Sequence, residues 1–256
     1  MAMKEEIVQQ IKALEEKHRV KVLFACESGS RAWGFASPDS DYDVRFIYMQ
    51  RPDHYLSIRD RRDTIELPVN EVLDISGWDI RKALQLFLRS NATLYEWLQS
   101  PIVYQEETDF SVQLRSRMSR YFSHRAGCHH YLSMTKNTFE NDLQGEEVRL
   151  KRYFYALRPA LACRWILERR SVPPMEFHLL RQLVTDAGWQ ETVNDLLVRK
   201  AAAAEKAMIA PVVSLQTWIA DTLVECKEKA DALRPETHDT DDLDGLFRKT
   251  IGNLLP

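Results

Sequence analysis

The chain has 256 residues, of which 45% are hydrophobic and 29% are charged, and its formal net charge is −3 at pH 7. This length is enough for one large core or two small ones, and the composition is that of a globular protein. The small negative charge excludes a globally basic nucleic-acid binder but not a local basic face. No apolar run approaches the roughly 20 residues of a membrane span.

The amino-terminal segment predicts an amphipathic helix over residues 3–18, with Ile7, Ile11 and Leu14 along one face. It has neither the apolar core nor the cleavage site of a signal peptide, so a cytoplasmic location is expected. The four cysteines are scattered and form no Cys-x-x-Cys pair. This spacing favours reduced thiols over disulfides or a zinc site.

Two short apolar runs, residues 20–26 and 44–49, predict the first two strands. The first run leads into Gly29 and Ser30, which predict a tight turn. A loop rich in turn-forming residues then connects this turn to the second strand.

Asp41 and Asp43 lie at the start of the second strand, separated by one residue. Side chains two apart in a strand project from the same face, so both carboxylates are expected to point to one spot beside the Gly29–Ser30 turn. Two such charges require a cation, and oxygen ligands of this kind suit Mg²⁺. A turn with free backbone N–H groups beside a metal can cradle phosphate. The pattern predicts a site for a nucleoside triphosphate and two metals, where a hydroxyl attacks the α-phosphorus and pyrophosphate leaves.

The string ESGSRAWGFASPDSDYDVRFIY, residues 27–48, resembles the nucleotidyltransferase signature of the DNA polymerase β superfamily. Within that superfamily it is most similar to the YcgL-like, RNA-repair-associated branch, as are residues 73–104 and, more weakly, 151–166. The resemblance implies an α+β fold. A small polymerase-β-type α/β catalytic domain with a mixed sheet is expected over residues 1–104. An α-helical domain that closes the nucleotide cleft is expected over residues 105–256.

Residues 51–63 form a polar, turn-rich connection after the second strand, with arginines at positions 51, 59, 61 and 62. Most charge runs of this kind are solvated connecting loops. Contact with phosphate or RNA is the alternative, and both interpretations stay open at this point.

The next stretch, residues 64–75, is expected to be extended again. The resemblance implies a third carboxylate on a strand beside the first pair, acting as general base and metal ligand. Glu66 and Asp74 both qualify. Asp74 is preferred because it lies between Leu73 and Ile75, a pattern that turns the acid away from the core.

Residues 76–79 are expected to turn the chain into a helix that runs to about residue 90, with Ser76 or Asp79 as its cap. The helix dipole is a sufficient structural reason for an acid at Asp79. From about residue 105, helical periodicity runs almost unbroken to about residue 233. The acidic segment 234–245 is expected to be a mobile or loosely held loop before a last short helix.

The helical half offers four candidates for nucleotide contacts, namely Lys136, Lys151, Tyr155 and Arg158. The last three are spaced for one helical face, which can equally be a hydrated surface.

Together these patterns and the resemblance predict a Mg²⁺-dependent nucleotidyltransferase, with Mn²⁺ as a substitute metal. It would transfer a nucleoside monophosphate from an NTP to a hydroxyl acceptor, for which the resemblance suggests an RNA end. The expected catalytic residues and metal ligands are Asp41, Asp43 and Asp74. The expected nucleotide-binding residues are Gly29, Ser30, Arg31, Ser40, Lys136, Lys151, Tyr155 and Arg158. The alternatives are transfer to a protein or small molecule, and a catalytically silent nucleotide-binding protein.

Overall fold

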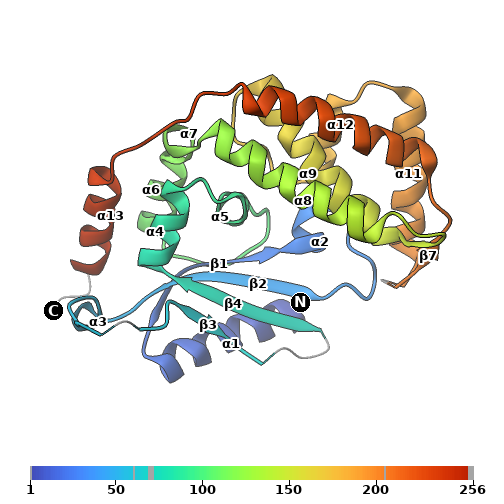
Figure 1. The fold of residues 1–256 in the computed structure, drawn as a ribbon. Helices are drawn as coiled ribbons and strands as arrows, with labels where there is room; N and C mark the ends of the chain where they lie inside the picture. The colour runs from blue at the N-terminus through green and yellow to red at the C-terminus, as the bar shows by residue number, and fades with distance from the viewer. Residues whose placement is uncertain (1, 60, 69–71, 205, 253–256) are drawn as a thin grey trace.

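The structure, a computed structural model, describes residues 2–59, 61–68, 72–204 and 206–252 (Figure 1). Within these residues, five strands form one mixed sheet in the order β3-β4-β2-β1-β5. β2 and β4 are parallel, and the other neighbours are antiparallel. The strands are β1 (Lys21–Ser28), β2 (Tyr42–Met49), β3 (Thr64–Glu66), β4 (Leu73–Asp79) and β5 (Val103–Glu106). A separate ribbon consists of β6 (Val148–Arg149) and β7 (Met208–Ile209).

Helices cover both faces of this sheet (Figure 1). α1 (Ala2–His18) lies below it, with Ile7, Ile11 and Leu14 buried against β1, β2 and β4, which confirms the predicted helix. The opposite face carries α2 (Gly29–Trp33), α4 (Ile80–Leu88) and α5 (Ala92–Leu98).

The remaining helices form a further layer above that face and also line one flank of the molecule (Figure 1). They are α3 (Pro52–Tyr55), α6 (Thr108–Ser116), α7 (Met118–Tyr121), α8 (His124–Asp142), α9 (Leu150–Arg169), α10 (Phe177–Leu180), the 3-10 turn Arg181–Leu183, α11 (Ala187–Ala202), α12 (Val213–Asp231) and α13 (Asp241–Gly252).

Residues from Asp241 onward in the acidic segment 234–245 belong to α13, whereas a mobile or loosely held loop was expected up to residue 245. Asp242 accepts two hydrogen bonds from the guanidinium of Arg117, at 2.9 and 2.7 Å. Glu236 accepts the backbone N–H of His124 at 2.6 Å. Leu243 is buried, so charged contacts and one apolar side chain together hold the segment against the rest of the protein.

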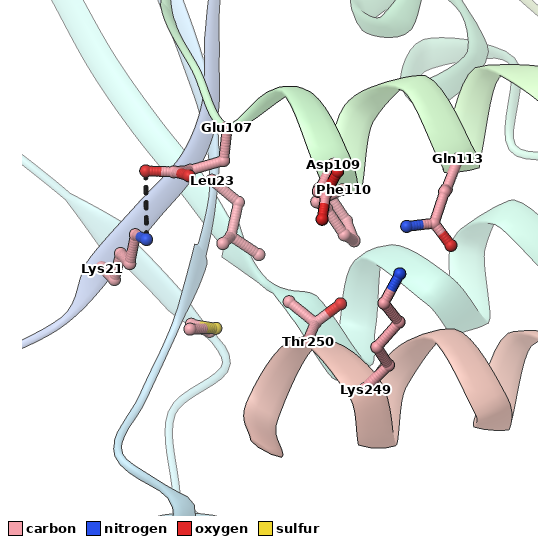
Figure 2. Close-up of a pocket in the computed structure, with 9 residues that line it drawn as sticks. Lys21, Leu23, Glu107, Asp109, Phe110, Gln113, Lys249 and Thr250 are labelled. Atoms are coloured by element: carbon pink, nitrogen blue, oxygen red, sulfur yellow. Dashed lines mark ion pairs between the residues drawn. The ribbon is translucent and has the colours of Figure 1, made fainter. Parts of the chain in front are cut away.

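The carboxyl-terminal helix α13 packs beside α6 and the sheet. Figure 2 shows Thr250 of α13 facing Phe110 of α6 and Leu23 of β1 across a small pocket of about 60 Å³. Lys21 and Glu107 form an ion pair of 3.0 Å at its rim.

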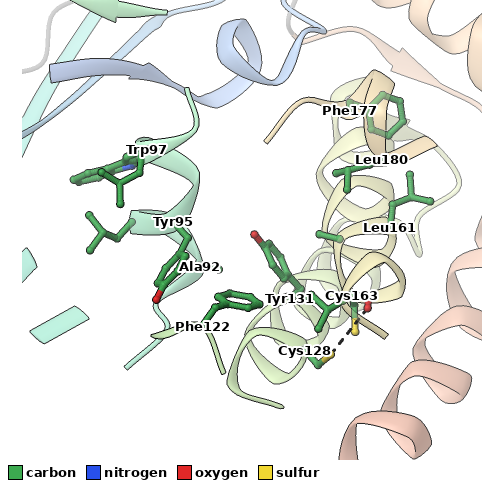
Figure 3. Packing of buried hydrophobic residues seen from close by; sticks show 14 of the residues in the cluster. Ala92, Tyr95, Trp97, Phe122, Cys128, Tyr131, Leu161, Cys163, Phe177 and Leu180 are labelled. Carbon is green, nitrogen blue, oxygen red and sulfur yellow. Dashed lines mark hydrogen bonds between the residues drawn. The ribbon is translucent and has the colours of Figure 1, made fainter. Parts of the chain in front are cut away.

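One buried cluster continues from the sheet into the helical layer. Figure 3 shows Trp97 and Tyr95 of α5 on one side, and Tyr131 of α8 and Leu161 of α9 on the other. The hydroxyl of Tyr131 donates to Glu96 of α5 at 2.8 Å. The cluster contains residues from both sides of position 104, so the sheet and the helical layer are packed on each other.

The predicted turn at residues 76–79 is wrong, because β4 continues to Asp79. Gly77 lies against the ring of Phe46 on β2, and a Cβ there would come within 2.4 Å of ring carbons. Glycine is therefore needed for the close approach of side chain and strand rather than for a turn. The cap was expected correctly, since Asp79 accepts the N–H of Arg81 at 2.8 Å.

All four cysteines are free and buried. None of the helices in the described part of the chain combines the length and apolar character needed to cross a bilayer.

Candidate functional site

β1 ends at Ser28, and Gly29 turns the chain into the short helix α2. The φ angle of Gly29 is +67°, in the left-handed region that glycine adopts without steric cost. A Cβ at this position would lie 2.2 Å from Oδ2 of Asp43 on β2. The backbone of Gly29 is therefore in contact with the Asp43 carboxylate, and the position requires glycine for both conformation and space.

The register of β2 and β4 places Asp43 directly opposite Asp74. The guanidinium of Arg45 lies between the two carboxylates, with Nη2 at 3.2 Å from Oδ1 of Asp43 and 2.7 Å from Oδ2 of Asp74. These three side chains are between 19% and 33% exposed, so solvent reaches them. The two acids thus already share one positive charge, supplied by a residue that sequence reasoning missed.

Asp41 lies one residue before β2, and its side chain is exposed. Its carbonyl accepts from Nε of Arg31 at 3.1 Å, and the carbonyl of Ser40 accepts from Nη2 at 2.5 Å. The same guanidinium stacks on the ring of Tyr42 at 3.8 Å. Arg31 therefore ties this loop to α2.

The expected cluster of three carboxylates is not assembled in this structure. Across residues 2–59, 61–68, 72–204 and 206–252, no three His, Cys, Asp or Glu side chains are grouped so that they could hold a metal ion. Only Asp43 and Asp74 are brought together, while Asp41 remains apart from Arg45.

The alternative third acid, Glu66, lies on β3 opposite Ser76. It is therefore separated from β2 by the whole width of β4. Asp74, facing Asp43 across the parallel pair, is the better placed of the two.

Ser40 shapes the loop that leads to Asp41. Its hydroxyl accepts the N–H of Ser37 at 2.9 Å and lies 2.9 Å from the Ser37 hydroxyl. Lys200 of α11 donates to the Ser37 hydroxyl at 3.2 Å, and all three side chains are at most 3% exposed. The helical half thus contacts the loop through a buried lysine that no local pattern identified.

Glu27 is a second residue of the site that sequence reasoning missed. Its Oε1 accepts the N–H of Asp43 at 2.8 Å, and its Oε2 accepts the hydroxyl of Tyr104 on β5. Burial raises the pKa of the Glu27 carboxyl. This acid fixes the first residues of β2 and so positions Asp43. Its place inside the motif, two residues before Gly29, was the available signal.

α9 brings one of the predicted residues to α2. The ring of Tyr155 meets that of Trp33 edge-on at 5.4 Å. Lys151 lies one turn earlier on the same face of α9.

The other two candidates of the helical half are Arg158 and Lys136. The guanidinium of Arg158 lies over the ring of Trp33 on α2, 4.4 Å from its centroid. Arg158 is 1% exposed, forms an ion pair of 2.8 Å with Glu96 and donates to the carbonyl of Met175 at 3.0 Å. It is a buried structural residue, which is not the nucleotide contact we expected. Lys136 pairs with Glu140 at 3.8 Å in a groove lined by α8 and α12 alone.

Comparisons with known proteins are consistent with this geometry. The family model for "RNA repair pathway DNA polymerase beta family" matches residues 3–249. A protein of Bacillus subtilis (strain 168), "Uncharacterized protein YcgL", is 42% identical over 251 residues, covering 97% of this chain and 96% of the relative. A nucleotidyltransferase-like protein from Exiguobacterium sibiricum 255-15 aligns at 12% identity over 96% of this chain and 80% of its own, but the TM-score of 0.29 is too low to carry an argument. By the family match and this relative, the chain belongs to the RNA repair pathway DNA polymerase beta family.

Proposed function

We propose that the protein is a Mg²⁺-dependent nucleotidyltransferase that transfers a nucleoside monophosphate from an NTP to the terminal hydroxyl of an RNA. Family membership suggests a polymerase-β-type nucleotidyltransferase, and the family description names RNA repair. The observation that carries the proposal is the pair of facing carboxylates, Asp43 and Asp74, with Gly29 packed against one of them.

The donor set fits a divalent metal. Asp43 and Asp74 present hard oxygen ligands of the kind that Mg²⁺ and Mn²⁺ prefer, and Arg45 shows that a cation is accommodated between them. These two acids would hold the metal, and Asp41, whose side chain is exposed, would join them if the segment that leads into β2 moved. A metal bound there would lower the pKa of the acceptor hydroxyl and neutralise the departing pyrophosphate.

The remaining residues of the site would hold and orient the substrates. Ser30 and the backbone N–H groups after Gly29 would contact the triphosphate. Arg31 would reach its terminal phosphates by leaving the two loop carbonyls that it now binds. Tyr155, beside α2, and Lys151, one turn earlier on α9, would contact the nucleotide from the helical side. Because little covalent chemistry falls to the protein, the rate would come from positioning and charge stabilisation.

The test is a transfer assay with each labelled NTP, Mg²⁺, and either short RNA or whole-cell protein as acceptor. Label in the RNA fraction is the expected result, and label in protein would favour the alternative acceptor. Asp43→Asn and Asp74→Asn should abolish transfer, whereas Glu66→Gln, the matched control on β3, should retain it. Absence of label in every fraction from a folded protein would refute the proposal.

A catalytically silent nucleotide-binding protein is the second candidate. The observation in its favour is Arg45, whose single positive charge pairs with both acids where a metal would be expected. Nucleotide binding that is independent of Mg²⁺, with no transfer, would support this candidate.

A further inference from the structure

A second pocket lies at the opposite ends of the two strands that carry the facing acids. It measures about 190 Å³ and is formed by the connection after α3 and the first turns of α4. Asp74 is near the start of β4 and Asp79 at its end, so roughly 17 Å of strand separates them, at about 3.4 Å per residue. The pocket is therefore distinct from the candidate transfer site.

Basic side chains dominate the lining of this pocket. The charged groups are Arg59, Arg61, Arg62, Arg81, Lys82, Asp63 and Asp79. The first three arginines are exposed, and none has an acidic partner among the residues that the structure describes. Asp60, between them in sequence, lies outside that part of the chain. These guanidinium groups are available to an anion from solution.

The two acids of the pocket are engaged within the protein. Asp63 forms an ion pair of 3.0 Å with Lys82. Asp79 accepts the hydroxyl of Tyr55 at 2.9 Å and the N–H of Arg81 at 2.8 Å. Both oxygens of Asp79 and Oδ1 of Asp63 are engaged in this way, so competition with a ligand for the arginines is limited to Oδ2 of Asp63.

The same connection exposes two large apolar side chains. Leu56 is 85% exposed and Ile58 is fully exposed, at 103%. Arginines that pair with phosphate, beside apolar groups that can cover a base or sugar, suit a single-stranded nucleic acid. A small inorganic anion would make no use of the apolar groups.

The position of the pocket relates it to the candidate site. Residues 61–63 run directly into the edge strand β3, which pairs with β4 (Figure 1). Asp74 lies on that same side of the sheet, beyond the end of β3. A single-stranded nucleic acid bound at the pocket can therefore extend along the β3 edge of the sheet towards Asp43 and Asp74.

We propose that this basic pocket binds the phosphate groups of single-stranded RNA, a few nucleotides away from the end that would be modified. The inference rests on the proposed function only for the reaction at that end. Binding itself requires neither metal nor NTP.

The test measures binding of a fluorescently labelled RNA of about 12 nucleotides, within the size range of single-strand sites. Fluorescence anisotropy is recorded without NTP or divalent metal, so the result does not depend on catalysis. The pocket variant combines Arg59→Gln, Arg61→Gln and Arg62→Gln. Its affinity should fall at least tenfold near 0.1 M salt, and the slope of log affinity against log salt should decrease by about 2, at roughly 0.7 per phosphate contact.

A matched control combines Arg169→Gln, Arg170→Gln and Arg234→Gln, which removes the same charge from arginines that are also exposed. This control should keep wild-type affinity within about twofold. Equal losses in both variants, an unchanged pocket variant, or a wild type that does not bind RNA would overturn the inference. A pocket variant that loses only the ability to bind inorganic pyrophosphate would overturn it as well. None of these binding results bears on the alternative acceptors of the proposed function, a protein or a small molecule, which the transfer assay tests separately.

Discussion

Replacing Gly29 with alanine should destabilise the protein more than the same change at Gly34. Both glycines adopt the left-handed backbone conformation, with φ of +67° and +87°. The left-handed conformation costs alanine about 1–2 kcal/mol at either position. At Gly34 an added Cβ meets nothing within 4 Å, so this cost stands alone. At Gly29 the Cβ would lie 2.2 Å from Oδ2 of Asp43, so the carboxylate must move. Overpacking of this kind adds about 1–3 kcal/mol.

Urea unfolding of the wild type and both variants, followed by circular dichroism, measures these differences. Moving the Asp43 carboxylate should also weaken Mn²⁺ binding, measured by electron paramagnetic resonance, about tenfold in Gly29→Ala and not in Gly34→Ala. Equal losses of stability in the two variants would refute the contact between Gly29 and Asp43.

Three further changes probe the buried and half-buried charges. Arg45→Met should cost about 1–2 kcal/mol, because two facing carboxylates lose their shared counter-charge, and a urea midpoint equal to that of the wild type would contradict this. The raised pKa of Glu27 means that the folded state holds this proton more tightly, so its contribution to stability falls as pH rises from the ordinary value of 4.5 through the folded pKa. Glu27→Gln should remove this component, and parallel pH profiles of wild type and variant would contradict the reasoning. Arg158→Met should cost about 3–5 kcal/mol, because the buried Glu96 carboxylate keeps only the Tyr131 hydroxyl as a partner. Adding Glu96→Gln should recover part of the loss, and wild-type stability of the single variant would exclude the structural pair.

Elements whose burial follows a local period can be predicted from sequence. The apolar face of α1 and the two strands around Gly29 are of this kind, because each residue's environment is set by its own helix or strand. The alternation around Asp74 also indicated the side of β4 on which the acid lies, since Leu73 and Ile75 are buried. The acid was therefore expected on the correct face of what proves to be the fourth strand. The extended stretch predicted over residues 64–75 contains β3 and the first residues of β4.

Features that depend on distant partners could not be predicted in this way. The role of Glu27 depends on two hydrogen bonds to distant partners. They come from the N–H of Asp43, 16 residues away, and the hydroxyl of Tyr104, 77 residues away. Gly77 is a common turn signal whose actual role is set by the Phe46 ring on another strand. Helical spacing placed Arg158 on a face with Lys151, but it does not report that this part of α9 is enclosed by other elements.

The parallel pairing of β2 and β4 has a consequence for how the protein matures. Parallel neighbours cannot be joined by a tight hairpin, so the chain from residue 50 to residue 72 must be synthesised before they can pair. Non-local pairings of this kind are slow to form. During synthesis, a ribosome-bound chain that has released β2 but not β4 holds only Asp43 of the two facing carboxylates. The pair should therefore form only after β4 has emerged and paired with β2.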